Sequence, residues 1–163
     1  MATEIERKFL VRDQRWHDAA GRGERFRQGY MVGGAHASVR VRVSDEQAWL
    51  NIKSATIDVS RLEYEYAVPL ADAEEMLEHL CVKPLIEKRR YWVEYGDHTW
   101  EVDCFEGDNA GLVVAEVEMS HPDEPIALPP WVSTEVSHLP RYYNVCLVEH
   151  PYKNWSAEER KGL

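Results

Sequence analysis

Residues 4–11 read Glu4-Ile5-Glu6-Arg7-Lys8-Phe9-Leu10-Val11, a run that mixes charged and apolar side chains. Its apolar residues favour a β-strand, and successive side chains of a strand point to opposite faces. Glu4, Glu6 and Lys8 therefore share one face. A solvated edge would tolerate three charges in a row, but the same alternation returns along the chain, which indicates an enclosed polar cavity.

Alternation of this kind predicts strands through most of the chain. In residues 37–44 it places Arg40 and Arg42 opposite three valines, and in residues 60–70 it places Glu63 and Glu65 opposite an apolar face. These apolar faces are expected to pack in the core. After the first strand, the predicted strands cover residues 26–32, 37–44, 48–54, 60–70, 85–95, 98–105 and 112–120.

Turns and short helices are predicted between and after these strands. Gly33-Gly34 is expected to supply the positive φ of one hairpin turn, and Gly96-Asp97 forms another. Residues 71–81 carry apolar side chains at helical spacing and predict an amphipathic helix. Further short helices are predicted within residues 131–147 and after Ser156, which has Glu159 at capping-box spacing.

Eight short strands with one interposed helix predict a mainly β, α+β fold. The expected architecture is an antiparallel eight-stranded sheet closed into a barrel, or tunnel, with a few flanking helices. The chain has 163 residues, 44% of them hydrophobic, which is enough for one domain with a good core. We therefore expect a single domain over residues 1–163, with residues 151–163 as a C-terminal tail.

Charge and cysteine content narrow the classes of partner. A net charge of −10 makes nucleic acid and anionic membranes poor partners, because phosphate groups are held by basic surfaces. Three cysteines, far apart in sequence and without a CxxC pair, fit a reducing compartment. The sequence shows no signal peptide and no apolar run long enough to span a bilayer. The expected location is the cytoplasm.

The charged faces predict the chemistry of the cavity. Burying them without a ligand would cost several kcal/mol per unpaired ion. Arginine and lysine match phosphate oxygens, and interleaved carboxylates would repel a phosphate unless a hard cation lay between them. Oxygen ligands favour Mg²⁺ or Mn²⁺. The sequence therefore predicts a metal-bound polyphosphate; the alternative is a set of salt bridges on an exposed sheet, each contributing only ~0–1 kcal/mol.

These motifs resemble the CYTH family of triphosphate tunnel metalloenzymes. The family signature ExExK is matched by Glu4-Ile5-Glu6-Arg7-Lys8. The match continues in order through Arg40-Val41-Arg42, Lys53, Glu63-Tyr64-Glu65, Lys88-Arg89-Arg90, Asp103 and Glu116-Val117-Glu118. The resemblance implies an antiparallel eight-stranded tunnel that binds a triphosphate and a divalent metal. Arg27-Gln28-Gly29-Tyr30 adds a likeness to short bacterial tripolyphosphatases.

The resemblance also implies roles for individual residues. Lys88 would assist the leaving phosphate, and Glu4 and Glu6 would act with it in catalysis. The residues expected to bind the phosphates are Lys8, Arg40, Arg42, Lys53 and Arg90. The residues expected to hold metal or a metal-ordered water are Glu4, Glu6, Asp103, Glu116 and Glu118, with Glu63 and Glu65 at a second metal position or paired with basic residues.

One departure concerns the C-terminal part of the chain. Relatives often carry Lys-Arg-Tyr where this chain has Pro140-Arg141-Tyr142, so one phosphate-binding lysine is missing and Arg141 is the candidate replacement. The expected function is metal-dependent hydrolysis of inorganic tripolyphosphate to pyrophosphate and phosphate. The alternatives are a class IV adenylate cyclase, a thiamine triphosphatase and a non-catalytic polyphosphate- or nucleotide-binding protein. Either a monomer or a homodimer fits the sequence.

Overall fold

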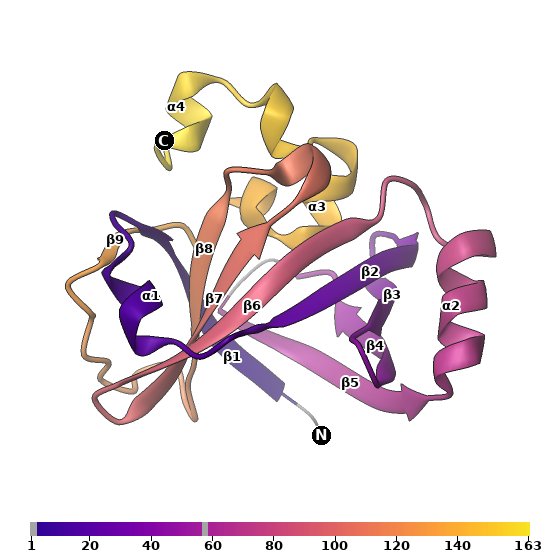
Figure 1. Cartoon of the computed structure of the whole chain (residues 1–163), viewed down its shortest axis with the longest axis horizontal. Helices are drawn as coiled ribbons and strands as arrows, with labels where there is room; N and C mark the ends of the chain where they lie inside the picture. The colour runs from indigo at the N-terminus through magenta and orange to yellow at the C-terminus, as the bar shows by residue number, and fades with distance from the viewer. Residues whose placement is uncertain (1–2, 57–58) are drawn as a thin grey trace.

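The computed structural model describes residues 3–56 and 59–163, and β-strands dominate it (Figure 1). The strands are β1 (Thr3–Val11), β2 (Glu24–Gly33), β3 (Ala37–Val43), β4 (Ala48–Ser54), β5 (Ser60–Val68), β6 (Ile86–Tyr95), β7 (His98–Phe105), β8 (Val113–Glu118) and β9 (Val132–Glu135). The helices are α1 (Arg15–Ala19), α2 (Leu70–His79), α3 (Asn144–Glu149) and α4 (Ala157–Arg160). Single 3-10 turns are η1 (Gly107–Asn109), η2 (Pro140–Tyr142) and η3 (Tyr152–Asn154).

Strands β1 to β8 form one closed antiparallel ring. Neighbours follow the order β5-β4-β3-β2-β6-β7-β8-β1, and the start of β1 pairs with the start of β5. This closure is possible because β1 changes partner along its length. Its residues 3–5 pair with β5, and its residues 6–10 pair with β8. The predicted closed sheet of eight strands is confirmed.

The period of two along each strand separates a charged inner face from a largely apolar outer face. On β3, Arg40 and Arg42 line the interior, whereas Val41 and Val43 are buried outside in a cluster with α2. A second outer cluster includes Phe9 of β1, whose ring centroid lies 5.6 Å from that of Trp100. Core packing on the outside leaves the inner face free for polar side chains.

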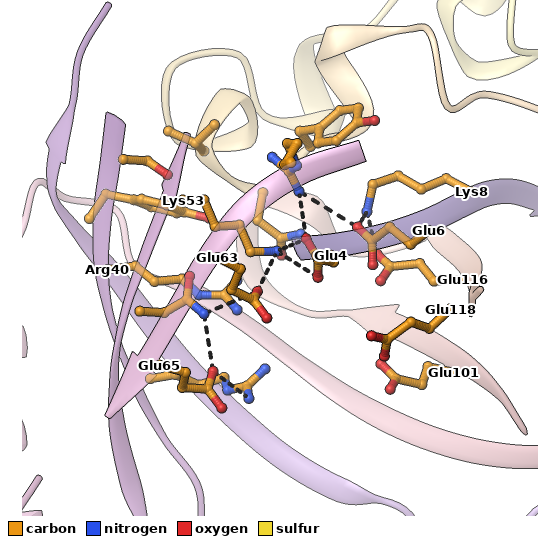
Figure 2. Close-up of a pocket in the computed structure, with 18 of the residues that line it drawn as sticks. Glu4, Glu6, Lys8, Arg40, Lys53, Glu63, Glu65, Glu101, Glu116 and Glu118 are labelled. Carbon is orange, nitrogen blue, oxygen red and sulfur yellow. Dashed lines mark hydrogen bonds and ion pairs between the residues drawn. The ribbon is translucent and has the colours of Figure 1, made fainter. Parts of the chain in front are cut away.

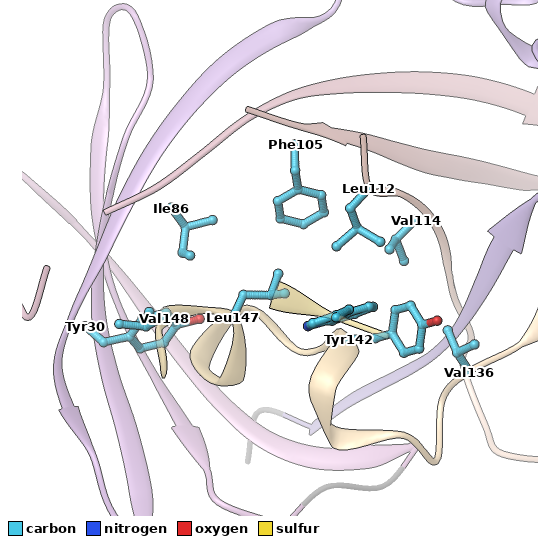
Figure 3. Packing of buried hydrophobic residues seen from close by; sticks show 10 residues of the cluster. Tyr30, Ile86, Phe105, Leu112, Val114, Val136, Tyr142, Leu147 and Val148 are labelled. Atoms are coloured by element: carbon cyan, nitrogen blue, oxygen red, sulfur yellow. The ribbon is translucent and has the colours of Figure 1, made fainter. Parts of the chain in front are cut away.

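One end of the ring interior is closed by apolar residues from the C-terminal part of the chain (Figure 3). Ile86 at the start of β6 and Phe105 at the end of β7 pack there with Leu147 of α3. Tyr142 and Trp155 belong to the same cluster, and their rings meet edge to face at 4.9 Å. The charged part of the interior therefore has an apolar floor.

The outer face of β5 differs from the prediction that it belongs to the core. Leu62 and Tyr64 are each 39% exposed and Tyr66 is 57% exposed. Helix α2 packs mainly on β3 and β4, so it covers the neighbouring strands and leaves this face largely open. Alternation showed which face is apolar, but it carries no information about which face a helix covers.

Two further predictions need correction. Within residues 131–147 the structure forms strand β9 before η2 and α3, because Val132–Glu135 pairs with the free edge of β1. Gly33 and Gly34 do not have positive φ. Their connection runs from Gly33 to Ala37 and is closed by the Gly34 N–H donating to the Ala37 carbonyl at 3.1 Å, so it is longer than a two-residue turn.

Other local predictions are confirmed. Gly96 has φ of 59° in the β6–β7 hairpin, as a tight turn requires. Ser156 caps α4 with a complete capping box, in which its side chain accepts from the Glu159 N–H and the Glu159 side chain accepts from the Ser156 N–H. In the described part of the chain, helices are too short or too polar to cross a bilayer.

Candidate functional site

A polar cavity lies inside the ring, and every predicted site residue lines it except Asp103 and Arg141 (Figure 2). The strands deliver these side chains because each contributes alternate residues to the inner face. Tyr143, Asn144 and Val145, at the start of α3, complete the lining. The ring thus gathers residues that are far apart in sequence around one space.

Acidic and basic side chains are paired across part of this cavity. Lys8 Nζ lies 2.5 Å from Glu116 Oε1 and 3.3 Å from Glu6 Oε1. Lys53 Nζ lies 2.9 Å from Glu4 Oε2 and 3.2 Å from Glu63 Oε2. Burial alone would lower the pKa of Lys8, but Glu116 and Glu6 raise it far above its ordinary value. Lys8 is therefore a permanent cation beside the ExExK carboxylates.

Asp103 lies beneath the cavity surface and holds two of the cations. Its Oδ1 accepts from Arg90 Nε at 2.7 Å, and its Oδ2 accepts from Arg90 Nη2 at 2.9 Å and Lys88 Nζ at 2.8 Å. Burial would raise the pKa of Asp103, but Arg90 and Lys88 hold it at about 2. Both oxygens are engaged by these cations, so this geometry suits positioning Lys88 and Arg90 rather than ligating a metal.

Positive charge is not fully compensated on the wall formed by β3. Within the described residues, the Nε atoms of Arg40 and Arg42 are buried without a hydrogen-bond partner. Burial lowers the pKa of Arg42 to about 10, and repulsion from Arg40 and Arg90 adds to this effect. Unpartnered donors beside crowded cations favour an anionic ligand, because such a ligand would supply both missing acceptors and missing negative charge.

Negative charge is not fully compensated on the opposite wall, which Glu101 of β7 and Glu118 of β8 line (Figure 2). Burial raises the pKa of Glu101 even though Arg90 Nη1 lies 2.5 Å from its Oε2. Burial also raises the pKa of Glu118, and the carboxylates of Glu4 and Glu6 add to the shift. The cavity thus has a cation-rich wall, with Arg40 and Arg42 of β3. It also has an acidic wall, with Glu101, Glu118 and the neighbouring Glu4 and Glu6 of β1.

Arg141 lies outside the cavity, although the resemblance placed it among the phosphate-binding residues. Its guanidinium donates to the Glu159 carbonyl at 3.1 Å and to the Leu163 carbonyl at 2.5 Å. It also lies over the rings of Tyr142 and Trp155, at 5.1 and 5.6 Å. In this arrangement Arg141 anchors the C-terminal tail.

The sequence profile of the CYTH domain matches residues 2–143. The chain belongs to the CYTH domain family. It is 45% identical over 155 residues to the inorganic triphosphatase of Acetivibrio thermocellus, a match that covers 95% of this chain and 99% of that protein. The ring has the CYTH tunnel fold.

Solved structures agree with this assignment to the CYTH family. The crystal structure of the inorganic triphosphatase NE1496 superposes with a TM-score of 0.64 at 30% identity, covering 91% of this chain and 95% of that one. A putative adenylyl cyclase from Hippeastrum, described with a dominant triphosphatase activity, superposes with a TM-score of 0.57 at 12% identity, covering 76% of this chain and 81% of that one. The latter likeness is one of fold alone.

Several residues of the CYTH cavity were not among the predicted site residues. Asn51, Arg61 and Glu101 line it, and each lies two residues from a predicted site residue on the same strand face. Strand alternation was therefore a sufficient signal for these three. Tyr143 and Asn144 also line the cavity, but they come from a segment without strand periodicity, and no sequence pattern pointed to them.

Asn144 connects α3 to Lys88. Its Oδ1 accepts from Lys88 Nζ at 3.2 Å and from Gln28 Nε2 at 3.2 Å. Asp103 and Asn144 together fix the position of the Lys88 amino group, which is buried yet borders the cavity. Lys88 is thus held at the base of the CYTH site by a carboxylate oxygen and an amide oxygen.

Proposed function

We propose that this CYTH protein hydrolyses inorganic triphosphate to pyrophosphate and phosphate with a divalent metal ion. The observation that carries the proposal is the combination, in one cavity, of arginine Nε donors that lack acceptors among the described residues with carboxylates whose charge the neighbouring cations compensate only in part. A triphosphate satisfies the first set and a divalent ion the second. The 45% identical relative named inorganic triphosphatase supports the same reaction.

The donor set of the acidic wall fits a hard cation. Glu4, Glu6 and Glu118 offer carboxylate oxygens on adjacent inner positions of β1 and β8, and Mg²⁺ or Mn²⁺ prefers such ligands. Among the described residues no three acidic, histidine or cysteine side chains are already arranged as a metal cage. Mg²⁺ commonly uses one or two carboxylates together with substrate phosphates, so a complete protein cage is not required.

Different residues of the cavity would take different roles in hydrolysis. Arg40, Arg42 and Arg90 would hold the phosphate oxygens, with Lys8 and Lys53 beside the ExExK carboxylates. Lys88, which Asp103 and Asn144 hold in position, would stabilise the leaving phosphate. A carboxylate of the acidic wall would orient the attacking water. A bound metal ion would neutralise charge on the transferring phosphoryl group, as phosphoryl transfer requires.

The lining favours an inorganic substrate over a nucleotide. In the described part of the chain, Val145 is the sole aliphatic residue of the cavity, and Tyr30 and Tyr143 are its aromatic ones. Tyr143 already lies against Lys8 Nζ and the Arg61 guanidinium, at 4.8 and 4.9 Å from its ring centroid. An adenine or thiamine ring would need an apolar slot, so tripolyphosphate is the proposed substrate ahead of ATP and thiamine triphosphate.

Ligand binding should stabilise the fold measurably. Tripolyphosphate with Mg²⁺ is expected to raise the melting temperature, because a ligand at 100 times its Kd contributes ~2.7 kcal/mol to the stability of the folded state. Differential scanning fluorimetry with tripolyphosphate in EDTA, with Mg²⁺ alone and with both together separates the contributions. Sulfate at matched ionic strength is the control, and an unchanged melting temperature at millimolar ligand would contradict binding in the cavity.

Lys88 should take up a proton when triphosphate binds. Burial lowers the pKa of Lys88 to about 7. Repulsion from Arg90 also lowers this pKa, whereas the negative charge of Asp103 raises it. At pH 8 the free amine is therefore mostly neutral, and the negative charge of a bound phosphate raises its pKa, so a proton is absorbed. The uptake should be smaller at pH 6, where the amine is already charged.

Calorimetry in two buffers of different ionisation enthalpy measures this uptake in EDTA, where no turnover occurs. The wild-type protein should absorb more protons at pH 8 than Lys88→Met, by up to one per site. The comparison with Lys88→Met removes protons exchanged by the triphosphate itself. Equal proton uptake by the two proteins would show that Lys88 does not gain charge on binding.

A further inference from the structure

Arg61 is a cavity residue in direct contact with the two glutamates of the ExExK motif. It lies opposite Glu4 in the β1–β5 pairing that closes the ring. Its Nη2 atom is 3.5 Å from Glu4 Oε2 and 3.6 Å from Glu6 Oε1, and its side chain is only 9% exposed. A single guanidinium thus bridges the carboxylates that would bind the metal ion.

These contacts are long compared with the other ion pairs of the same carboxylates. Lys53 approaches Glu4 to 2.9 Å and Lys8 approaches Glu6 to 3.3 Å. Among the described residues, three cations contact this pair of carboxylates, and the contacts of Arg61 are the longest. Since charge-assisted hydrogen bonds are normally ~2.7–2.9 Å long, its contacts are mainly Coulombic and are readily exchanged.

The guanidinium has a second support that does not depend on the carboxylates. It lies over the Tyr143 ring at 4.9 Å, and the Tyr143 hydroxyl donates to the Ser137 carbonyl at 2.7 Å. The ring is thus fixed from the far side. Tyr143 keeps the guanidinium at the cavity surface even when Glu4 and Glu6 take another partner.

We propose that Arg61 is an exchanging counter-ion of the site. Without ligands it neutralises Glu4 and Glu6 and so competes with a divalent cation for them. When triphosphate binds, its donors turn from the carboxylates to a phosphate oxygen while its guanidinium stays on Tyr143, and Glu4 and Glu6 become free to bind the metal ion. This inference rests on the proposed function, since it assigns a residue of the same cavity to metal competition and triphosphate binding.

The proposal predicts effects of opposite sign on the two ligands. In Arg61→Gln, Mn²⁺ alone should bind about fivefold more tightly, because a competing positive charge is removed, a coupling within the usual range for interacting sites. Tripolyphosphate in EDTA should bind about tenfold or more weakly, because a charge-assisted contact is lost. If the role of Arg61 were purely structural, the substitution would weaken the binding of both ligands or of neither.

The experiment titrates the folded protein with Mn²⁺ by electron paramagnetic resonance and with tripolyphosphate by calorimetry in EDTA. Arg61→Lys retains the charge and should keep Mn²⁺ affinity near that of the wild type. A difference in Mn²⁺ affinity between Arg61→Gln and Arg61→Lys therefore reports the loss of charge and not the loss of the arginine side chain from the fold. Arg89→Gln is the matched control, because its guanidinium donates to the Arg22 carbonyl on the exposed side of β6.

Each outcome has a definite meaning. Tighter Mn²⁺ binding together with weaker triphosphate binding in Arg61→Gln supports the exchange. If the Mn²⁺ affinity of Arg61→Gln is unchanged or weaker, the exchange is overturned. The proposed function still stands in that case, provided that the wild-type protein binds both ligands. If the wild-type protein binds neither Mn²⁺ nor tripolyphosphate, both the exchange and the proposed function are wrong.

Discussion

Glu4→Gln should lower the turnover of tripolyphosphate by about two to three orders of magnitude, the usual effect of removing a major electrostatic contribution to a transition state. The amide keeps the shape of the side chain but removes a negative charge from the acidic wall, so the divalent ion loses a ligand. Steady-state phosphate release at saturating Mg²⁺ measures the change.

Stability should change little in the same variant. Lys53 loses one partner but keeps Glu63 at 3.2 Å, so no buried cation is left unpaired. We expect a loss of ~1 kcal/mol, equivalent to a melting temperature lower by about 2–4 °C. Glu87→Gln is the matched control, because Glu87 lies outside the cavity. This substitution removes a carboxylate whose Oε1 is 3.2 Å from Arg25 Nη2. Near-normal turnover in Glu4→Gln would remove Glu4 from the metal site.

Arg42→Met should raise KM for tripolyphosphate by about 10- to 100-fold with a smaller effect on kcat. The guanidinium has a buried Nε without an acceptor among the described residues, and a charge-assisted hydrogen bond to phosphate contributes ~1.5–3 kcal/mol. Methionine retains apolar contact with the nearby rings of Phe26 and Trp49, which now lie 4.9 and 5.3 Å from the guanidinium carbon.

The same substitution should raise the melting temperature of the ligand-free protein. The pKa of Arg42 is about 10, below its ordinary value, so folding disfavours its charged form and a neutral side chain removes that cost. Arg89→Met, on the other face of β6, provides the control for loss of an arginine. An unchanged KM with a lower melting temperature would make Arg42 a structural residue instead of a substrate-binding one.

Strand alternation predicted the ring and most of its inner face, because it depends only on the geometry of consecutive residues. It could not predict how deeply each inner-face side chain is buried. Asp103 and Glu101 share a face of β7, yet Asp103 is fully buried under Lys88 and Arg90 while Glu101 lines the cavity. Depth depends on how β6 and β7 align across the sheet, and that register is a property of the folded ring.

The C-terminal part of the chain was the least predictable for the same reason. Its side chains reach the site through tertiary packing, so Asn144 contacts Lys88 while nearby Arg141 turns toward the Glu159 and Leu163 carbonyls. Strand β9 is only four residues long and forms because β1 offers a free edge. Segments this short carry too few alternating positions to be recognised in sequence.

The most direct test of the proposed activity is phosphate release from tripolyphosphate, pyrophosphate, ATP and thiamine triphosphate, each with EDTA, Mg²⁺ or Mn²⁺, together with chromatography for cyclic AMP. We expect metal-dependent release that is fastest with tripolyphosphate, with phosphate and pyrophosphate formed in equal amounts and no cyclic AMP from ATP. Faster turnover of ATP with formation of cyclic AMP, or binding of tripolyphosphate without any hydrolysis in either metal, would contradict the assignment.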